Sequence, residues 1–342
     1  MYQHPIPKQS LIYAVAPCMD WTDRHCRYFH RLLSKRALLY TEMVVADALI
    51  FGDIDRHLSY SDCEHPVALQ LGGSAPEKLA KAAKIGAEWG YDEINLNVGC
   101  PSDRVQSGVF GACLMEQPEL VANCVDAMKQ VVDIPVTVKC RIGVDDQDPE
   151  VALPALAHAV FAQHCDGIWV HARKAWLQGL SPKQNRDVPP LDYAIVHALK
   201  AEFPDKFIGI NGGLKTPKEA REVSHLSGNT DAQPLNGVML GRASYQNPSI
   251  LLEVDEVIYG DQEQAPSFES ICDAMMSYTA AHLSVGGRVN HITRHMIGLF
   301  QGQVGARRFR QIMSVEAAKP DADERVIEQA FAAVASTVTT AA

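Results

Sequence analysis

Several features that would assign a protein to a class are absent from this 342-residue sequence. It has no run of 18 apolar residues, which excludes an α-helical membrane span. Its nine cysteines include no C-x-x-C pair, and nine is an odd number, so we expect neither a bound metal nor a disulfide framework. Residues 1–10 carry no signal-peptide pattern, and we therefore expect a protein of the reducing cytoplasm.

Positive charge is also in deficit. The chain has 31 Lys and Arg residues against 41 Asp and Glu residues, which gives a formal net charge of −10. This balance argues against a protein that coats nucleic acid non-specifically, although it leaves room for a local basic patch. With 47% hydrophobic residues and no low-complexity segment, the sequence indicates a globular protein of one or two domains.

What the sequence does contain is a regular alternation of two patterns. Eight short apolar runs rich in β-forming residues lie at 12–17, 37–43, 66–71, 93–97, 134–140, 167–171, 207–211 and 237–241. Helical patterns lie between several of them, at 76–89, 118–131, 150–164, 193–203 and 217–226. Eight such units in about 240 residues fit a (β/α)8 TIM barrel of the α/β class. A doubly wound sheet fits less well, because no G-x-G-x-x-G follows the first run.

The alternation ends after Tyr259. Residues 260–267 are acidic and contain Pro266. Only helical patterns follow, at 268–285, 291–301, 305–313 and 323–338. We therefore predict a domain boundary near residue 260, with a catalytic barrel over residues 1–260 and an all-helical domain over residues 261–342.

In a barrel of this kind the functional groups project from the C-terminal ends of the strands. Two of these ends carry glycine: Asn211-Gly212-Gly213 follows the seventh run, and Gly241-Arg242 follows the eighth. Glycines there expose backbone N–H groups to an anion, and these two loops often bind phosphate in such barrels. Two tight turns are the alternative, but the pair of motifs together with the charge of Arg242 favours a phosphorylated ligand.

Other strand ends carry side chains suited to a ring-shaped ligand. Lys139 ends the fifth run, where it can act as a Schiff-base nucleophile or as a charge that stabilises an anion. A structural ion pair with Glu42 is the alternative for this lysine. Gln70 and Asn97 offer amides for the edge of a heterocycle, or for loop backbone. His171 can bind phosphate or a ring oxygen, or it can be an ordinary core histidine.

Cys100 follows the fourth run and lies between Gly99 and Pro101, which shape its loop. A thiol with a pKa of about 8.5 is mostly protonated at neutral pH, so it can donate a proton to a carbanion as well as attack as a nucleophile. Its position after a strand favours a catalytic role over a structural one.

Two basic segments interrupt the acidic sequence. Residues 171–186 and residues 288–310 each contain several cations and no acidic residue. Their cations are Arg173, Lys174, Lys183 and Arg186 in the first segment and Arg288, Arg294, Arg307, Arg308 and Arg310 in the second. Aromatic residues lie among them, which is typical of a surface that binds RNA phosphates, while a solvated helical face is the alternative.

Together these motifs resemble those of the tRNA-dihydrouridine synthases, most closely of their A subfamily. The resemblance runs from Ala16 to Met313 and rests on APCMDWTDRHCR, LLYTEMV, PVALQLGGS, GYDEINLNVGCPSDRVQSGVFGACLM, IPVTVKCRIG, HARKAWLQGLSPKQNR, INGG and GVMLGRASYQNP. LNVGCPSDRVQSG and HARKAWLQGLSPKQNR are long and specific, whereas INGG and LGR fit many phosphate-binding barrels. Cys18 departs from the family pattern, in which a methionine precedes Met19.

The resemblance implies an enzyme that reduces the C5=C6 bond of D-loop uridines in tRNA, at positions 20 and 20a. It implies tightly bound, non-covalent FMN in the barrel, NADPH as the electron donor and a helical tRNA-binding domain. The residues implied to hold FMN are Pro17, Cys18, Met19, Gln70, Lys139, His171, Asn211, Gly212, Gly213, Gly241 and Arg242.

The resemblance also assigns chemical roles. Cys100 is implied to give a proton to uracil C5 after hydride reaches C6, and Lys139 is implied to stabilise the charge of reduced flavin. The residues implied to contact tRNA are Asn97, Lys183, Arg186, Arg307 and Arg310. We expect tRNA as the partner, no metal, no membrane and a monomer.

Three alternatives remain open. A flavin barrel that acts on a free small molecule, such as dihydroorotate or an enoate, leaves the basic tail without a role. A binding protein with an RNA surface and an idle barrel leaves Lys139 and Cys100 unexplained. A Schiff-base aldolase that uses Lys139 is the third.

Overall fold

The computed structural model describes residues 11–101, 110–225 and 233–340, with side chains up to residue 334. Its centre is a closed barrel of eight parallel strands, β1 (Ile12–Val15), β2 (Leu38–Tyr40), β4 (Val67–Gly72), β5 (Glu93–Val98), β6 (Val136–Arg141), β7 (Gly167–His171), β8 (Phe207–Asn211) and β9 (Gly237–Leu240). β1 pairs with both β2 and β9, and β2 pairs with β4, so the barrel closes. A short extra strand, β3 (Val44–Val45), pairs with the end of β4. The predicted (β/α)8 TIM barrel is confirmed.

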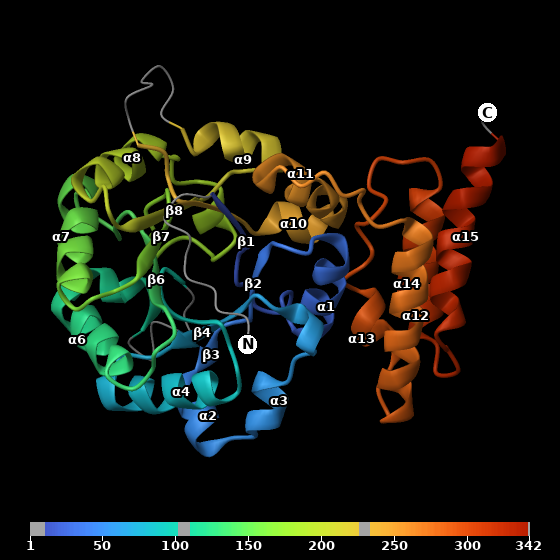
Figure 1. The fold of residues 1–342 in the computed structure, drawn as a ribbon, viewed down its shortest axis with the longest axis horizontal. Helices are drawn as coiled ribbons and strands as arrows, with labels where there is room; N and C mark the ends of the chain where they lie inside the picture. The colour runs from blue at the N-terminus through green and yellow to red at the C-terminus, as the bar shows by residue number, and fades with distance from the viewer. Residues whose placement is uncertain (1–10, 102–109, 226–232, 341–342) are drawn as a thin grey trace.

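Helices pack around the outside of the barrel (Figure 1). They include α1 (Arg24–Leu33), α4 (Pro76–Glu88), α6 (Pro118–Lys129), α7 (Pro149–Ala162), α8 (Tyr193–Glu202), α9 (Pro217–Val223) and α11 (Val254–Tyr259). Proline occupies the first turn of α4, α6, α7 and α9, where its missing N–H costs no helical hydrogen bond. Each helix that the sequence predicted between strands starts within one residue of its predicted start. The short α2 (Ala46–Phe51) and α3 (Ile54–Leu58) were not predicted.

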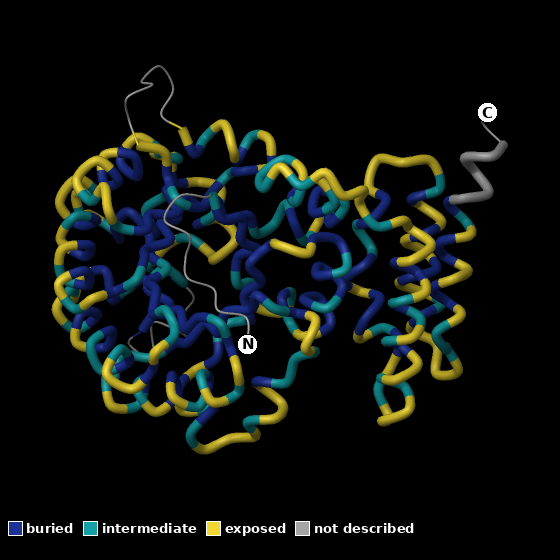
Figure 2. Tube along the Cα trace, viewed as in Figure 1, coloured by how far each residue is buried: buried dark blue, intermediate teal, exposed yellow. Residues whose placement is uncertain are grey.

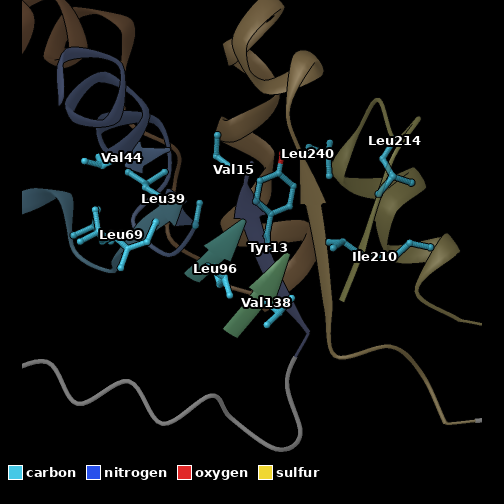
Figure 3. Packing of buried hydrophobic residues seen from close by; sticks show 14 of the residues in the cluster. Tyr13, Val15, Leu39, Val44, Leu69, Leu96, Val138, Ile210, Leu214 and Leu240 are labelled. Atoms are coloured by element: carbon cyan, nitrogen blue, oxygen red, sulfur yellow. The ribbon is translucent and has the colours of Figure 1, made fainter. Parts of the chain in front are cut away.

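Alternate residues of each strand face the surrounding helices, as expected for a barrel. Tyr13, Val15, Leu69, Leu96 and Val138 belong to this outer layer (Figure 3). They form one large buried cluster with the apolar faces of the helices, and this cluster fixes the strands from outside.

The intervening residues face the barrel interior. A second buried cluster surrounds Trp169 there. A Cβ at Gly209 would lie 2.2 Å from the Trp169 ring, so only glycine leaves room for the indole. Other interior positions are polar, namely Gln70, Glu93, Asn95, Asn97, Thr137, Lys139, His171 and Asn211. The interior therefore holds hydrogen-bonding groups that an ordinary apolar core does not need.

The last helices form a bundle at one side of the barrel, beside α1 (Figure 1). They are α12 (Phe268–Ser284), α13 (Val289–Thr293), α14 (Ala306–Val315) and α15 (Arg325–Thr340). Phe300, Phe309 and Phe331 meet edge to face at the centre of this bundle. The outward faces of its helices are largely exposed (Figure 2). The domain boundary near residue 260 stays a prediction.

One predicted helix is wrong. Residues 291–301 are not a continuous helix, because α13 ends at Thr293 and turns follow as far as Gly305. A Cβ at Gly298 would lie 2.2 Å from the carbonyl oxygen of Gln246, so this glycine packs directly on the backbone of the barrel region. Gly302 and Gly305 have φ angles of 80° and 88°, which interrupt a helix.

Two absences hold for the part of the chain that the structure describes. No helix there has the length and apolar character to cross a membrane. No group of three or more His, Cys, Asp or Glu side chains is placed to hold a metal ion.

Candidate active site at the barrel mouth

The C-terminal ends of the strands meet at the barrel mouth, where strand register decides which side chains are neighbours. Asn97 of β5 lies opposite Lys139 of β6. His171 of β7 lies between Arg141 of β6 and Asn211 of β8. Residues that the sequence singled out at separate strand ends are therefore gathered on one rim.

Lys139 is a half-buried cation of this rim. Its Nζ donates a hydrogen bond to Asn211 Oδ1 at 3.1 Å, and Asn211 donates to the carbonyl of Met239 at 2.7 Å. Burial, followed by the charge of Arg141, lowers the pKa of Lys139 to about 8. Among the described residues Lys139 forms no ion pair, so the structural pair with Glu42 is absent there. The ammonium group keeps donors for an anion in the mouth.

Glycines shape the ends of β8 and β9. Gly212 and Gly213 have φ angles of 117° and 74°, which glycine adopts without strain. A Cβ at Gly212 would lie 2.7 Å from the ring of His171. A Cβ at Gly213 would lie 2.4 Å from Leu191. Beside this turn, no side chain of the described residues caps the first turn of α10 (Arg242–Gln246), so its backbone N–H groups can face a ligand.

His171 lies under the glycine turn and is 9% exposed. Burial, together with the charges of Arg141 and Lys139, holds the pKa of His171 well below its ordinary value, so the ring is neutral. The ring makes no hydrogen bond to the described part of the chain. A neutral imidazole has one donor and one acceptor nitrogen, and both can serve a ligand.

Arg242 is the first residue of α10. Its guanidinium pairs with the carboxylate of Asp187 at 2.7 Å and donates to the carbonyl of Arg186 at 3.2 Å. A phosphate bound at the glycine turns would therefore share Arg242 with Asp187. That Arg242 binds phosphate stays a prediction.

The segment that follows β1 leads to the same mouth. The backbone amide of Ala16, directly after β1, donates to the carbonyl of Leu240 at 2.8 Å, which places this segment beside Gly241. A Cβ at Gly241 would lie 3.5 Å from the sulfur of Cys18. Burial raises the pKa of Cys18 to about 11, so this thiol is neutral. Exposure increases along the segment, from half-buried Pro17 to Met19, which is 53% exposed.

The loop after β5 presents Cys100, which is half-buried. Asn97 Oδ1 accepts the backbone amides of Gly99 and Cys100 at 3.1 and 3.0 Å. Arg141 Nε donates to the carbonyl of Gly99 at 3.2 Å. A Cβ at Gly99 would lie 3.3 Å from the backbone of Cys140 and 3.4 Å from the carbonyl oxygen of Lys139, so the Cys100 loop packs against the end of β6.

Gln70 and Asn97, two predicted ligand contacts, bind each other. Asn97 Nδ2 donates to Gln70 Oε1 at 2.8 Å, and the two residues are 9% and 1% exposed, respectively. The side chain of Asn97 also binds the Cys100 loop, and the side chain of Gln70 also donates to Asn95 in the barrel interior. Residues 102–109, which continue the Cys100 motif, lie outside the described residues.

Asn185 organises the basic segment after β7, although the sequence pattern did not single it out. Its Oδ1 accepts the amide of Trp176 at 2.7 Å, and its Nδ2 donates to the carbonyl of Trp176 at 2.8 Å. Arg141 donates to the carbonyl of Asn185 at 2.9 Å and so joins this segment to the rim. Lys183 is exposed and Arg186 is half-buried.

The other predicted tRNA contacts lie on α14, in the bundle. Arg307 and Arg310 are exposed, whereas Phe309 between them is buried. This alternation points the two arginines outward while the phenylalanine anchors the helix. The structure thus separates the predicted tRNA contacts into two groups, one on the barrel and one on the bundle.

Asp23 joins the barrel to the bundle. It caps the N-terminus of α1, where it accepts the amides of His25 and Cys26. Its carboxylate also accepts hydrogen bonds from Arg294, at 2.5 Å, and from His295, at 3.0 Å. Burial alone would raise the pKa of Asp23, but these partners outweigh burial and hold the pKa well below its usual range. The carboxylate is therefore ionised at neutral pH.

Comparison with known proteins decides the family. The family model described as "Dihydrouridine synthase (Dus)" matches residues 14–335. This chain belongs to the dihydrouridine synthase family. Like other members, it is an oxidoreductase that acts on uridine in tRNA. The predicted family is confirmed, and the free small-molecule reductase, the idle barrel and the aldolase are not supported.

Three relatives show how far the similarity of this dihydrouridine synthase extends. It is 56% identical to the tRNA-dihydrouridine(20/20a) synthase of Shewanella oneidensis, over 94% of this chain and 93% of that protein. It is 54% identical to the enzyme of the same name from Vibrio cholerae, over 94% of this chain and 96% of the relative. For the Escherichia coli enzyme of that name the identity is 54%, over 94% of this chain and 91% of the relative.

Proposed function

We propose that this chain reduces uridines 20 and 20a of tRNA, with FMN as its bound cofactor, NADPH as the electron donor and Cys100 as the proton donor. The observation that carries the proposal is the placement of the Cys100 loop beside Lys139 on one rim, because Asn97 lies opposite Lys139 and its side chain accepts the amide of Cys100. Reduction of a C5=C6 bond needs a proton donor, and an electron-rich cofactor needs a cation. The uridine positions come from the names of the relatives.

The residues of the mouth fit FMN. A Cβ at Gly241 would lie 3.3 Å from Ala16 and 3.5 Å from Cys18, so it would fill space at the mouth, whereas a Cβ at Gly212 or Gly213 would clash with neighbouring side chains. The first turn of α10, which no described side chain caps, offers N–H groups for a phosphate. Lys139 has one side-chain acceptor among the described residues and is partly desolvated, so an anion beside it would raise its pKa and stabilise its positive charge. Neutral His171 offers a donor and an acceptor to the same ligand.

The chain itself has to place the substrate, hold charge and move one proton. FMN would supply the hydride for uracil C6. Lys139 would stabilise the negative charge of reduced flavin. It stays protonated there because an adjacent anion raises the pKa of a buried lysine. Cys100 donates its thiol proton to C5, where negative charge develops after hydride addition. Asn97 and Arg141 keep the Cys100 loop in place through the Gly99 peptide groups.

For tRNA binding we propose contacts by Lys183, Arg186, Arg307 and Arg310. Their support is their position in the two segments that contain cations and no acidic residue, and three of the four are exposed. The target uridine has to leave its stack to reach the mouth, at a cost of a few kcal/mol, and phosphate contacts offset that cost. Asn97, at the edge of the mouth, would contact the nucleotide.

We also propose a division of the chain into an FMN-binding barrel over residues 1–260 and a tRNA-binding helical domain over residues 261–342. The left-handed Gly260 after α11 supports this boundary. Because a single chain supplies every proposed site residue, we propose a monomer. We propose the cytoplasm as its location because its substrate is tRNA.

Cys100→Ala tests the proposal, and Cys63→Ala is the matched control because Cys63 is exposed and precedes the N-terminal end of β4, at the opposite end of that strand from the mouth. We expect Cys100→Ala to lower dihydrouridine formation at least about 100-fold, since it removes the proton donor. FMN content and tRNA affinity should not change. Dihydrouridine is measured by mass spectrometry of tRNA after single turnover. Wild-type turnover in Cys100→Ala would refute the acid role, and protein that takes up no flavin would refute the cofactor.

A further inference from the structure

A chain of hydrogen bonds begins at the Cys100 loop and runs into the barrel. The backbone amides of Gly99 and Cys100 donate to Asn97 Oδ1. Asn97 Nδ2 then donates to Gln70 Oε1 at 2.8 Å, and Gln70 Nε2 donates to Asn95 Oδ1 at 2.8 Å. Each amide thus accepts on the side of the loop and donates on the side of the barrel interior.

The chain of hydrogen bonds continues to the buried carboxyl group of Glu93. Asn95 Nδ2 donates to Thr137 Oγ1 at 2.7 Å, and the Thr137 hydroxyl donates to Glu93 Oε1 at 2.5 Å. Tyr40 donates its hydroxyl to the same Glu93 oxygen, but it is not part of the path to Cys100. Asn95 and Thr137 are 0% exposed and Glu93 is 5% exposed, so water does not compete for these bonds.

The chemistry of the two ends fixes the direction of every link. The backbone amides at the loop can only donate, and Glu93 Oε1, which accepts from both Thr137 and Tyr40, stays an acceptor when a proton is on the other carboxyl oxygen. Reversing one amide would place N–H against N–H at one end of it and oxygen against oxygen at the other. All side chains between the loop and Glu93 are therefore held in one orientation. Breaking one hydrogen bond removes this constraint from the side chains between the broken bond and the loop.

We propose that Glu93, Asn95 and Thr137 are positioning residues that act through Gln70 and Asn97 to hold the Cys100 loop at the barrel mouth. None of the three is at the C-terminal end of a strand, because Glu93 begins β5, and Asn95 and Thr137 lie within β5 and β6. They face the barrel interior and set where the thiol is presented rather than contact the substrate. This inference rests on the proposed role of Cys100.

Thr137→Val breaks the chain at its centre with little change in shape. The matched control is Tyr40→Phe, which removes the other hydroxyl that donates to Glu93 but leaves the path to Cys100 complete. The primary measurement is hydrogen exchange of the Gly99 and Cys100 amides in the FMN-loaded protein. We expect exchange about tenfold faster in Thr137→Val, the effect of losing roughly one hydrogen bond, and unchanged exchange in Tyr40→Phe. Thr137→Ser should restore wild-type exchange.

Turnover supplies the second readout. Thr137→Val should lower kcat for dihydrouridine formation about tenfold, because the same lost bond loosens the proton donor, while KM for tRNA and NADPH oxidation without tRNA stay unchanged. A loss of general stability would instead lower all of these and would also appear in Tyr40→Phe. Thr137→Ser should again behave as wild type.

Unchanged exchange at Gly99 and Cys100 in Thr137→Val would overturn the proposal, as would equal effects in Thr137→Val and Tyr40→Phe. If Thr137→Val does not yield folded protein, Asn95→Leu removes the next link and carries the same expectation. The exchange measurement needs neither tRNA nor turnover. Faster exchange combined with a fully active Cys100→Ala would therefore refute the proposed function and leave the positioning role intact.

Discussion

The barrel mouth and the helical bundle hold their polar groups in opposite ways. At the mouth, Asn97, Lys139 and Arg141 are at least partly buried, and each has a defined hydrogen-bond partner. On α14, Arg307 and Arg310 extend from an exposed face. Proton transfer needs fixed atoms, whereas attraction of phosphates acts over about 8 Å at physiological salt and tolerates mobile side chains.

The largest expected effect belongs to the mouth. Lys139→Met keeps most of the side-chain length but removes the charge. We expect dihydrouridine formation to fall by about 100-fold or more, because the variant loses the cation that we propose stabilises reduced flavin. The Kd for tRNA should stay within about twofold. Single-turnover assays and filter binding measure the two quantities. Lys81→Met on the exposed surface of α4 is the control. Equal losses in turnover and tRNA affinity would contradict the division of roles between the barrel mouth and the bundle.

The bundle should show the reverse pattern. We expect Arg307→Ala combined with Arg310→Ala to weaken tRNA binding about tenfold and to reduce the slope of log Kd against log salt by about 2, because two phosphate contacts are removed. NADPH oxidation without tRNA should not change. Binding titrations at several salt concentrations measure the slope, with exposed Arg56→Ala as the control. An unchanged slope would place these arginines outside the interface.

The smallest expected effect concerns stability. Burial raises the pKa of Glu93 to about 7, against the hydrogen bonds from Thr137 and Tyr40. The pKa in the unfolded chain is about 4.3, so folded protein binds this proton more tightly. The stabilisation by protonated Glu93 is complete below about pH 4.3 and is lost as the pH rises through about 7.

Between pH 5 and 8, the Tm of the wild type should therefore fall by a few degrees more than the Tm of Glu93→Gln, which does not titrate at this position. Differential scanning calorimetry at several pH values measures this difference. Exposed Glu119→Gln should follow the wild type. Parallel Tm profiles for wild type and Glu93→Gln would show that Glu93 does not titrate in this range.

The barrel and much of its rim were predictable because they depend on local patterns. Buried strands in a parallel barrel are short apolar runs, and the residues that end them lie at the mouth by topology alone. Lys139 and His171 were found in this way. The glycines at 212 and 213 were found because a left-handed turn at a strand end requires that residue type.

The hydrogen-bond partners were not predictable, because they join residues far apart in the chain. Thr137 and Glu93 are 44 residues apart, and Asn95 and Gln70 are 25 apart. No periodicity in a sequence shows which amide meets which hydroxyl across a barrel. The helix expected at 291–301 was wrong for a related reason, because Gly298 is adapted to a distant backbone contact rather than to its own segment.

Asp23 connects the barrel to the helical bundle. One carboxylate both starts α1 of the barrel and pairs with Arg294 and His295 next to α13, so rotation of the bundle would uncap a helix and strand two basic groups in the same movement. The contacts of Asp23 thereby help to fix the distance between the arginines of α14, which we propose bind tRNA, and the thiol of Cys100, and under that proposal this distance would select the nucleotide of a bound tRNA that reaches the mouth.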